Sequence, residues 1–209
     1  MAASSSPSSS PSPSPAPDPD VRLDTARLRV LAHPMRLNVL ALLRLRGPAT
    51  ATRVAEALDI TPGSASYHLR RLAAGGLIAE VPERGAGRER WWRAVHRQSV
   101  HEPAEESVEQ GAAGRAYAQA VAQAAAERLR RAADEVPALP PEWYAAGVYA
   151  DFALRLAPDE VERLRAELFA VVDRYRRDPA DAPPGAAPVT LQMQAFAVPG
   201  TTEPGPDSA

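Results

Sequence analysis

The 209-residue chain contains no cysteine, no lysine and no long apolar run. The lack of cysteine excludes disulfides, thiolate metal sites and thiol redox sensing. No apolar stretch approaches the roughly 20 residues that span a bilayer, and the N-terminus lacks the basic and apolar regions of a signal peptide. We therefore expect a cytoplasmic protein with no membrane partner.

All 24 basic residues are arginine. Because arginine and alanine are abundant throughout, we attribute the missing lysine to a GC-rich genome rather than to selection for DNA binding. The 22 prolines gather toward the two ends of the chain. Residues 1–20 are rich in serine and proline and have nothing apolar to bury, so we expect them, and the similar tail 199–209, to be disordered.

The net charge of -2 hides two oppositely charged halves. Residues 21–100 hold 14 arginines against six acidic residues, a formal charge of +8, whereas residues 101–209 hold 10 arginines against 18 acidic residues, a formal charge of -8. A basic module is typical of proteins that bind a polyanion. Chance segregation of surface charge is the alternative, so the charge favours DNA without proving it.

Helical periodicity predicts helices over Thr25–Leu31, Pro34–Arg46 and Thr52–Leu58. A further helix follows a tight turn: Thr61 is its cap, Pro62 lies in its first turn, and glycines end it. Two short helices joined in this way form a helix-turn-helix, in which the second helix reads DNA. The segments 77–81 and 90–95 have strand composition and a glycine-containing connection, which predicts a hairpin and therefore a winged helix.

The predicted reading surface has two parts. Polar residues of the second helix lie off its apolar face, where their side chains meet base edges or phosphates in the major groove. Arginines flank the tip of the hairpin, where a guanidinium fits the negative potential of a narrow minor groove. The predicted DNA-binding residues are Gly63, Ser64, Ser66, Tyr67, Arg70, Arg71, Arg84, Arg88 and Arg90. The alternative for both parts is an ordinary solvated surface.

The C-terminal half is predicted to be a long helix followed by a small strand–helix–strand unit. Residues 104–135 are rich in alanine and helical, and we expect them to hold a dimer because small side chains allow close helix approach. Residues 148–156 and 189–196 alternate with period two, and a helix from Pro158 to about Arg177 lies between them. Two strands alone are marginal, so a second subunit is a candidate for completing the sheet.

The blocks LAHPMRLNVLALL, TRVAEALDITPGSASYHLRRLAAGGLIAEV and GRERWWRAV together resemble the ArsR-like winged helix-turn-helix transcriptional regulators over roughly residues 24–97. The resemblance implies a homodimeric repressor that an effector releases from its operator. Metal-sensing members carry a cysteine pair in the first helix of the motif, or Asp, His and Glu on the dimer helix. This chain has no cysteine, and residues 104–135 have no histidine, so we expect no metal site.

Other candidate sites are weaker. His101 with Glu102, Glu105 and Glu106 matches no metal-binding spacing and is read as a solvated helix start. An aromatic cluster outside the DNA module is either core or the lining of a pocket for an apolar or aromatic effector; its members are Trp143, Tyr144, Tyr149 and Phe152. We find no catalytic constellation or phosphate-binding loop, and therefore expect neither an enzyme nor a cofactor.

These observations predict a mainly α protein with a β-wing, in four parts: a disordered tail (1–20), a winged helix-turn-helix domain (21–100), a C-terminal dimerisation and effector region (101–198) and a second tail (199–209). The expected function is that of a sequence-specific DNA-binding transcriptional regulator, a dimeric repressor released by an effector. The expected partners are double-stranded DNA, a second copy and a small-molecule effector. The alternative is a winged-helix scaffold for protein interaction or dimerisation, without specific DNA binding.

Overall fold

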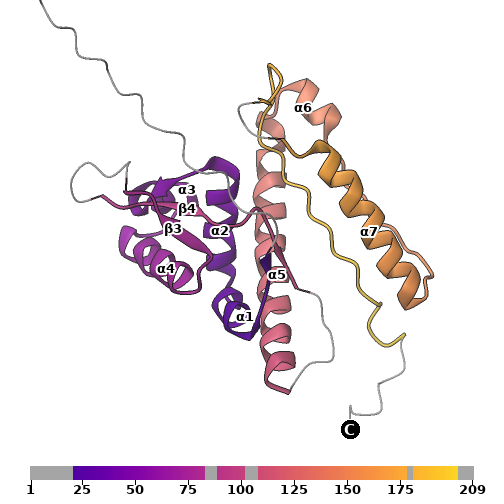
Figure 1. Cartoon of the computed structure of the whole chain (residues 1–209). Helices are drawn as coiled ribbons and strands as arrows, with labels where there is room; N and C mark the ends of the chain where they lie inside the picture. Colours follow the sequence, from indigo (N-terminus) through magenta and orange to yellow (C-terminus); the bar gives the residue numbers. More distant parts are fainter. Residues whose placement is uncertain (1–20, 83–88, 102–107, 178–180, 202–209) are drawn as a thin grey trace, which may run out of the picture. The chain divides into compact units, whose positions relative to one another are not determined.

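The computed structural model describes residues 21–82, 89–101, 108–177 and 181–201 (Figure 1). The chain divides into two compact units, residues 1–137 and 138–209. The predicted tail 1–20 and most of the predicted tail 199–209 lie outside the described residues.

Four helices and a small sheet form the first part of the first unit (Figure 1). The helices are α1 (Thr25–Leu31), α2 (Pro34–Arg46), α3 (Ala51–Leu58) and α4 (Pro62–Ala74). The strands are β2 (Ala49–Thr50), β3 (Ile78–Glu80) and β4 (Trp91–Ala94), which pair antiparallel in the order β2-β4-β3. The predicted winged helix-turn-helix is therefore confirmed, with β2 as an addition that the sequence did not predict.

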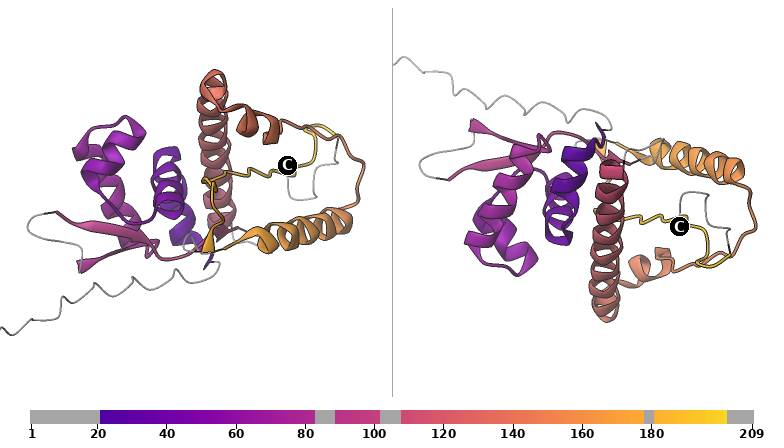
Figure 2. Two further views of the ribbon diagram at one scale, coloured as in Figure 1. Left: turned by 90° about the horizontal axis from the view of Figure 1, so that it is seen from above. Right: turned by 90° about the horizontal axis from the view of Figure 1, so that it is seen from below.

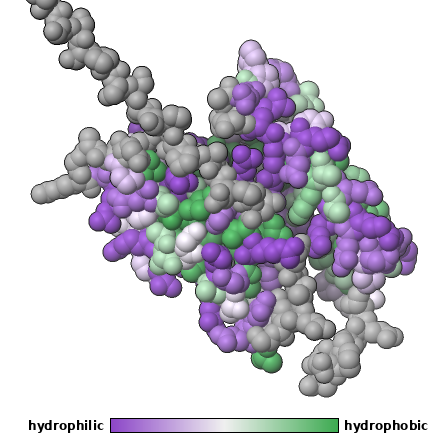
Figure 3. All heavy atoms as spheres, viewed as in Figure 1, coloured by the Kyte–Doolittle hydropathy of each residue, from purple (hydrophilic) through white to green (hydrophobic). Residues whose placement is uncertain are grey.

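One apolar core lies between these elements. Leucines supply most of its volume, and the fully buried side chains are Leu28, Leu31, Leu40, Leu43, Leu69, Leu72, Leu77, Val39 and Val54. Their helical spacing on α2 and α4 gives each helix one apolar stripe toward the core. Figure 3 shows hydrophobic residues gathered over the middle of this unit, around α2, with hydrophilic residues around them.

A second pairing joins the start of the domain to its end. Strand β1 (Val21–Arg22) runs parallel to β5 (Ser99–Val100), with Val21 opposite Ser99. Arg44 of α2 stabilises the same region. Its guanidinium donates hydrogen bonds to the carbonyl oxygen of His96 at 2.9 Å and to the Ser99 hydroxyl at 2.8 Å. The chain after the wing is thereby held against α2 before it enters the next helix.

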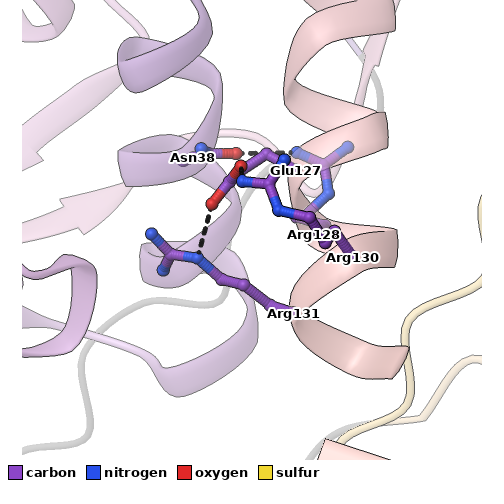
Figure 4. Close-up of polar contacts among 5 residues, drawn as sticks. All are labelled: Asn38, Glu127, Arg128, Arg130 and Arg131. Atoms are coloured by element: carbon purple, nitrogen blue, oxygen red, sulfur yellow. Dashed lines mark hydrogen bonds and ion pairs between the residues drawn. The ribbon is translucent and has the colours of Figure 1, made fainter. Parts of the chain in front are cut away.

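The long helix α5 (Val108–Glu135) packs against α1 and α2 of its own chain, and both views of Figure 2 show it beside them. Its small residues supply this contact, as the buried side of α5 is made of Ala113, Gly114, Ala120, Ala124 and Ala125. Polar contacts add to it: Arg128 donates to the Asn38 side-chain oxygen at 2.9 Å (Figure 4), and Arg29 forms an ion pair with Glu109. Part of the alanine-rich surface expected at a dimer interface is thus used within the chain.

The end of α5 carries a local cluster of charges. Glu127 accepts a hydrogen bond from Arg131 at 2.9 Å and is also paired with Arg130 (Figure 4). Both arginines lie one turn after the carboxylate, which is the spacing at which opposite charges support a helix. Hydrogen bonding to Arg131 lowers the pKa of Glu127.

The C-terminal part contains the 3-10 turn Val136–Ala138 and two helices, α6 (Pro141–Ala146) and α7 (Pro158–Tyr175). Helix α7 confirms the predicted helix. The two predicted strands were wrong for the isolated chain, because residues 148–156 and 189–196 are neither strand nor helix. A strand requires a hydrogen-bonded neighbour, and the described part of this chain places none beside either segment. None of the described helices is long and apolar enough to cross a membrane.

Candidate nucleic-acid interface

The turn before α4 is built by capping residues. Asp59 ends α3 in the left-handed conformation, with φ of 53°, and its backbone N–H donates to the carbonyl oxygen of Ala55. Asp is one of the few residues besides glycine that visit this conformation readily. Thr61 then starts α4, because its hydroxyl accepts the backbone N–H of Ser64 at 3.2 Å, and Pro62 occupies the first turn. These contacts set the angle between the two helices of the motif.

Helix α4 has one buried and one exposed side. Ala65, Leu69 and Leu72 face the core and form the apolar face expected for this helix. The predicted contact residues share the other side of the helix: Gly63, Tyr67, Arg70 and Arg71 are exposed, and Ser64 and Ser66 are half-buried. The structure therefore brings these six residues together on one surface, which we call the reading face.

Three members of the reading face, Tyr67, Arg70 and Gly63, have different local surroundings. Tyr67 is 51% exposed, which leaves its ring and hydroxyl available to a ligand. The Arg70 guanidinium folds back on its own helix, with Nε donating to the Ser66 carbonyl oxygen at 3.2 Å. A Cβ at Gly63 would meet nothing within 4 Å, so packing inside the protein does not require glycine there.

The predicted wing contacts are only partly visible. Arg84 and Arg88 lie outside the described residues. Arg90 is exposed and its Nε lies 3.8 Å from a carboxylate oxygen of Glu80, on the neighbouring strand. An exposed ion pair of this length contributes little to stability. The Arg90 guanidinium can therefore leave Glu80 and bind a DNA phosphate instead.

A cluster of aromatic and polar side chains lies between the reading face and the core. The rings of His33 and His68 are 4.9 Å apart, and Tyr67 meets His68 edge-on at 5.3 Å. His33 caps α2, since its Nδ1 accepts the backbone N–H of Met35 at 3.1 Å. His68 packs at the core with 6% of its surface exposed. Neither histidine sits in a metal-binding cluster among the described residues.

Sequence reasoning did not identify Arg36 as part of this cluster. Its side chain is 9% exposed, and its guanidinium donates to the carbonyl oxygens of Val30 and Arg29 near the end of α1. A charged donor is well placed at a helix C-terminus, where carbonyl groups lack partners within the helix. The available signal was the stretch HPMR within the block LAHPMRLNVLALL, in which Arg36 follows the cap His33 by three residues.

Arg53 of α3 was also missed. Its guanidinium carbon lies 4.6 Å from the ring centre of Trp91, a cation–π contact that ties α3 to β4. The next residue, Trp92, points to the other side and is 9% exposed. One tryptophan of the pair thus belongs to the core, and the other packs against Arg53 of α3.

Burial lowers the pKa of His68, and the neighbouring His33 and Arg36 lower it further. Burial and then Arg36 lower the pKa of His33 as well. Both rings are therefore neutral in the folded protein at pH values where they would be protonated in the unfolded chain. Stability is fully present above the ordinary value of 6.5 and is lost as the pH falls toward the lowered values.

We expect the free energy of unfolding, measured with urea at pH 7.5 and at pH 5.5, to be lower at pH 5.5. Replacing His68 with phenylalanine removes one titrating ring from the core and should reduce the difference between the two pH values. A difference of the same size in the parent and in His68→Phe would show that His68 does not contribute to it.

The aromatic residues of the predicted effector pocket are mostly exposed in the described structure. Tyr144, Tyr149 and Phe152 are 64%, 65% and 80% exposed, and Trp143 is half-buried. A hollow of about 180 Å³ lies instead between α2 and α5, where Leu40, Arg44 and Tyr117 contribute to its lining. Ligand sites usually have about 300–1,000 Å³, so this hollow is too small for most effectors. A pocket around the aromatic residues stays a prediction.

A family model described as a helix-turn-helix domain, which is found in ArsR-type regulators, matches residues 31–81. No curated protein matches the chain. Among solved structures, RV1404 from Mycobacterium tuberculosis is 15% identical, over 71% of this chain and 80% of that one, with a TM-score of 0.29. A likeness that distant carries no argument. The winged fold and the helix-turn-helix domain match support a DNA-binding regulator.

Proposed function

We propose that the chain is a sequence-specific transcriptional repressor that binds its operator as a homodimer. The observation that supports this most strongly is the reading face, whose six residues line up on the outer side of α4 while the opposite side is anchored in the core. A helix held in this way presents side chains to the major groove at a fixed angle. The +8 charge of residues 21–100 adds attraction to phosphate.

The proposed dimer brings two α4 helices to successive turns of the duplex, with half-sites about 34 Å apart. The outer side of α5 remains available for this, since Ala112, Ala116, Ala122 and Ala126 are exposed while the other side packs on α1 and α2. Release would follow from an effector with different affinities for the binding and non-binding geometries of the dimer. The proposal assigns the chain no enzymatic activity, no cofactor and no thiolate-bound metal.

The test is selection of duplexes from a random library by the full chain at near-physiological salt. We expect enrichment of a two-fold symmetric site whose half-sites are one helical turn apart. Binding without any enriched sequence would contradict sequence-specific recognition and support the winged-helix scaffold, for which DNA is not a specific partner. An enriched site without two-fold symmetry would contradict binding as a dimer but not sequence-specific recognition.

A further inference from the structure

Residues 148–156 form an exposed apolar row that nothing in the described part of the chain covers. Figure 1 draws this segment, between α6 and α7, as a plain coil, neither helix nor arrow. Val148, Phe152 and Leu154 are 77%, 80% and 62% exposed. They alternate with Tyr149, Asp151 and Arg155, which is the pattern of a strand with one apolar and one polar face. A row of this kind indicates an interaction surface.

The order of residues within the segment shows which partner fits it. In an antiparallel pair of two identical segments centred on Ala153, residues equally far from 153 on either side face each other. Asp151 then faces Arg155 of the second copy on the polar face, and Phe152 faces Leu154 of the second copy on the apolar face. Opposite charges and apolar pairs directly across two strands are both stabilising.

Other arrangements of two copies lose this match. A parallel pair in register places Asp151 against Asp151 and Arg155 against Arg155, and like charges directly opposite are destabilising. A shift by one residue moves the apolar row of one strand to the polar face of the other. The self-complementary antiparallel register therefore selects a second copy of this chain as the occupant.

We propose that residues 148–156 of two copies pair as antiparallel strands, with a two-fold axis passing at Ala153. The inference rests on the homodimer of the proposed function, and it does not depend on DNA binding. Residues 189–196 have no strand neighbour in the described structure of the single chain, and Val189 and Leu191 are 69% and 62% exposed; we assign this second alternating segment as the outer strand of each copy. The result is a four-stranded sheet, which is large enough to be stable where one strand pair is marginal.

Helix α7 is suited to cover one face of this sheet. Its exposed apolar residues include Leu168, Val171 and Tyr175, at 40%, 41% and 72%, and these lie three and four residues apart on one side of the helix. The order strand, helix, strand places α7 on one face of the sheet by a right-handed crossover. The polar face, with Asp151 and Arg155, then remains on the other side.

A single cysteine tests the register, because the native chain has none. At the proposed axis, the Cα atoms of the two copies of residue 153 are about 4.5–5.5 Å apart, within the range of about 4.4–6.8 Å that a disulfide needs. We expect full-length Ala153→Cys to form a covalent dimer on mild oxidation. The matched control is Tyr149→Cys, on the same face, whose two copies lie about 27 Å apart in this register and should cross-link at least tenfold less.

Charge exchange supplies a second readout. Asp151→Arg and Arg155→Asp each place like charges across the axis, and we expect each to weaken the dimer by roughly tenfold, measured by sedimentation. The double variant restores opposite pairs between copies and should recover most of the parent affinity. A variant that merely fails to fold would not be rescued in this way.

The outcomes separate this pairing from the proposed function. A dimeric chain in which both cysteines cross-link equally, or in which the double exchange rescues nothing, overturns the pairing and leaves DNA recognition intact. A monomeric chain overturns the pairing together with the dimer of the proposed function. Cross-linking at Ala153→Cys in a protein that selects no DNA site supports the pairing and contradicts the proposed function.

Discussion

Replacing Arg71 with alanine is expected to lower the affinity for the operator by about 10- to 100-fold while leaving the fold intact. Arg71 is exposed on the reading face, one turn after Tyr67, and a guanidinium there reaches either a guanine edge or a phosphate. Its side chain does not belong to the core, so the loss should appear in binding and not in stability. Fluorescence anisotropy with the selected duplex measures the first, and urea unfolding measures the second.

Two further variants make this test specific. Ser64→Ala removes a second side chain of the reading face but keeps the cap, because the bond to Thr61 uses the Ser64 backbone N–H. Arg174→Ala removes an exposed arginine from α7, outside the DNA-binding unit, and should bind DNA like the parent. If Arg71→Ala and Ser64→Ala both bind with unchanged affinity, the reading face is wrongly assigned.

Replacing Arg36 with alanine is expected to lower the free energy of unfolding of the first unit by about 2–3 kcal/mol. The guanidinium is the donor for the Val30 and Arg29 carbonyl oxygens, and without it these groups are left near the core with fewer partners. Arg36→Lys keeps the charge but has a single donor group, so a smaller loss is expected.

Urea unfolding followed by tryptophan fluorescence in a Trp143→Phe background measures this effect, since the two remaining tryptophans, Trp91 and Trp92, both lie in the first unit. The matched control is Arg46→Ala, an exposed arginine at the end of the same helix, for which a change within about 0.5 kcal/mol is expected. Equal stability of Arg36→Ala and the parent would mean that the contact between α1 and α2 does not depend on this side chain.

The helix-turn-helix was predictable because its signals are local. Thr61 and Pro62 mark the start of α4 within two residues, and leucine spacing marks its buried side, so both the helix and the membership of the reading face follow from short stretches of sequence. The same local signals gave α2 and α7. The wing required only two strand-like segments and a connection of suitable length.

The features that were missed all join residues far apart in the chain. The pairing of Val21 with Ser99 spans most of the domain and involves strands of two residues each, too short for any periodicity. The contact of Arg53 with Trp91 and the burial of Arg36 likewise depend on how elements pack. Helix α5 was recognised as helical, but alanine spacing does not say whether the partner is the same chain or another.

In the C-terminal segments, by contrast, a clear local pattern did not lead to the predicted structure. The alternation in residues 148–156 is a strong strand signal, yet the single chain forms no strand there, because a sheet needs hydrogen-bonding neighbours as well as a pattern. The period-two alternation also bears on the predicted effector pocket. Period two places Tyr149 and Phe152 on opposite faces of a strand, so a strand at this position would divide the predicted aromatic cluster.

The most direct test of DNA recognition is the affinity of the full chain for the DNA upstream of its own gene, compared with scrambled DNA across a salt series. We expect tighter binding to the upstream DNA by about 10³ or more, with both affinities falling as salt rises because phosphate contacts release counterions. Equal affinity for the two DNAs at every salt concentration, with a library selection that enriches no site, would contradict it.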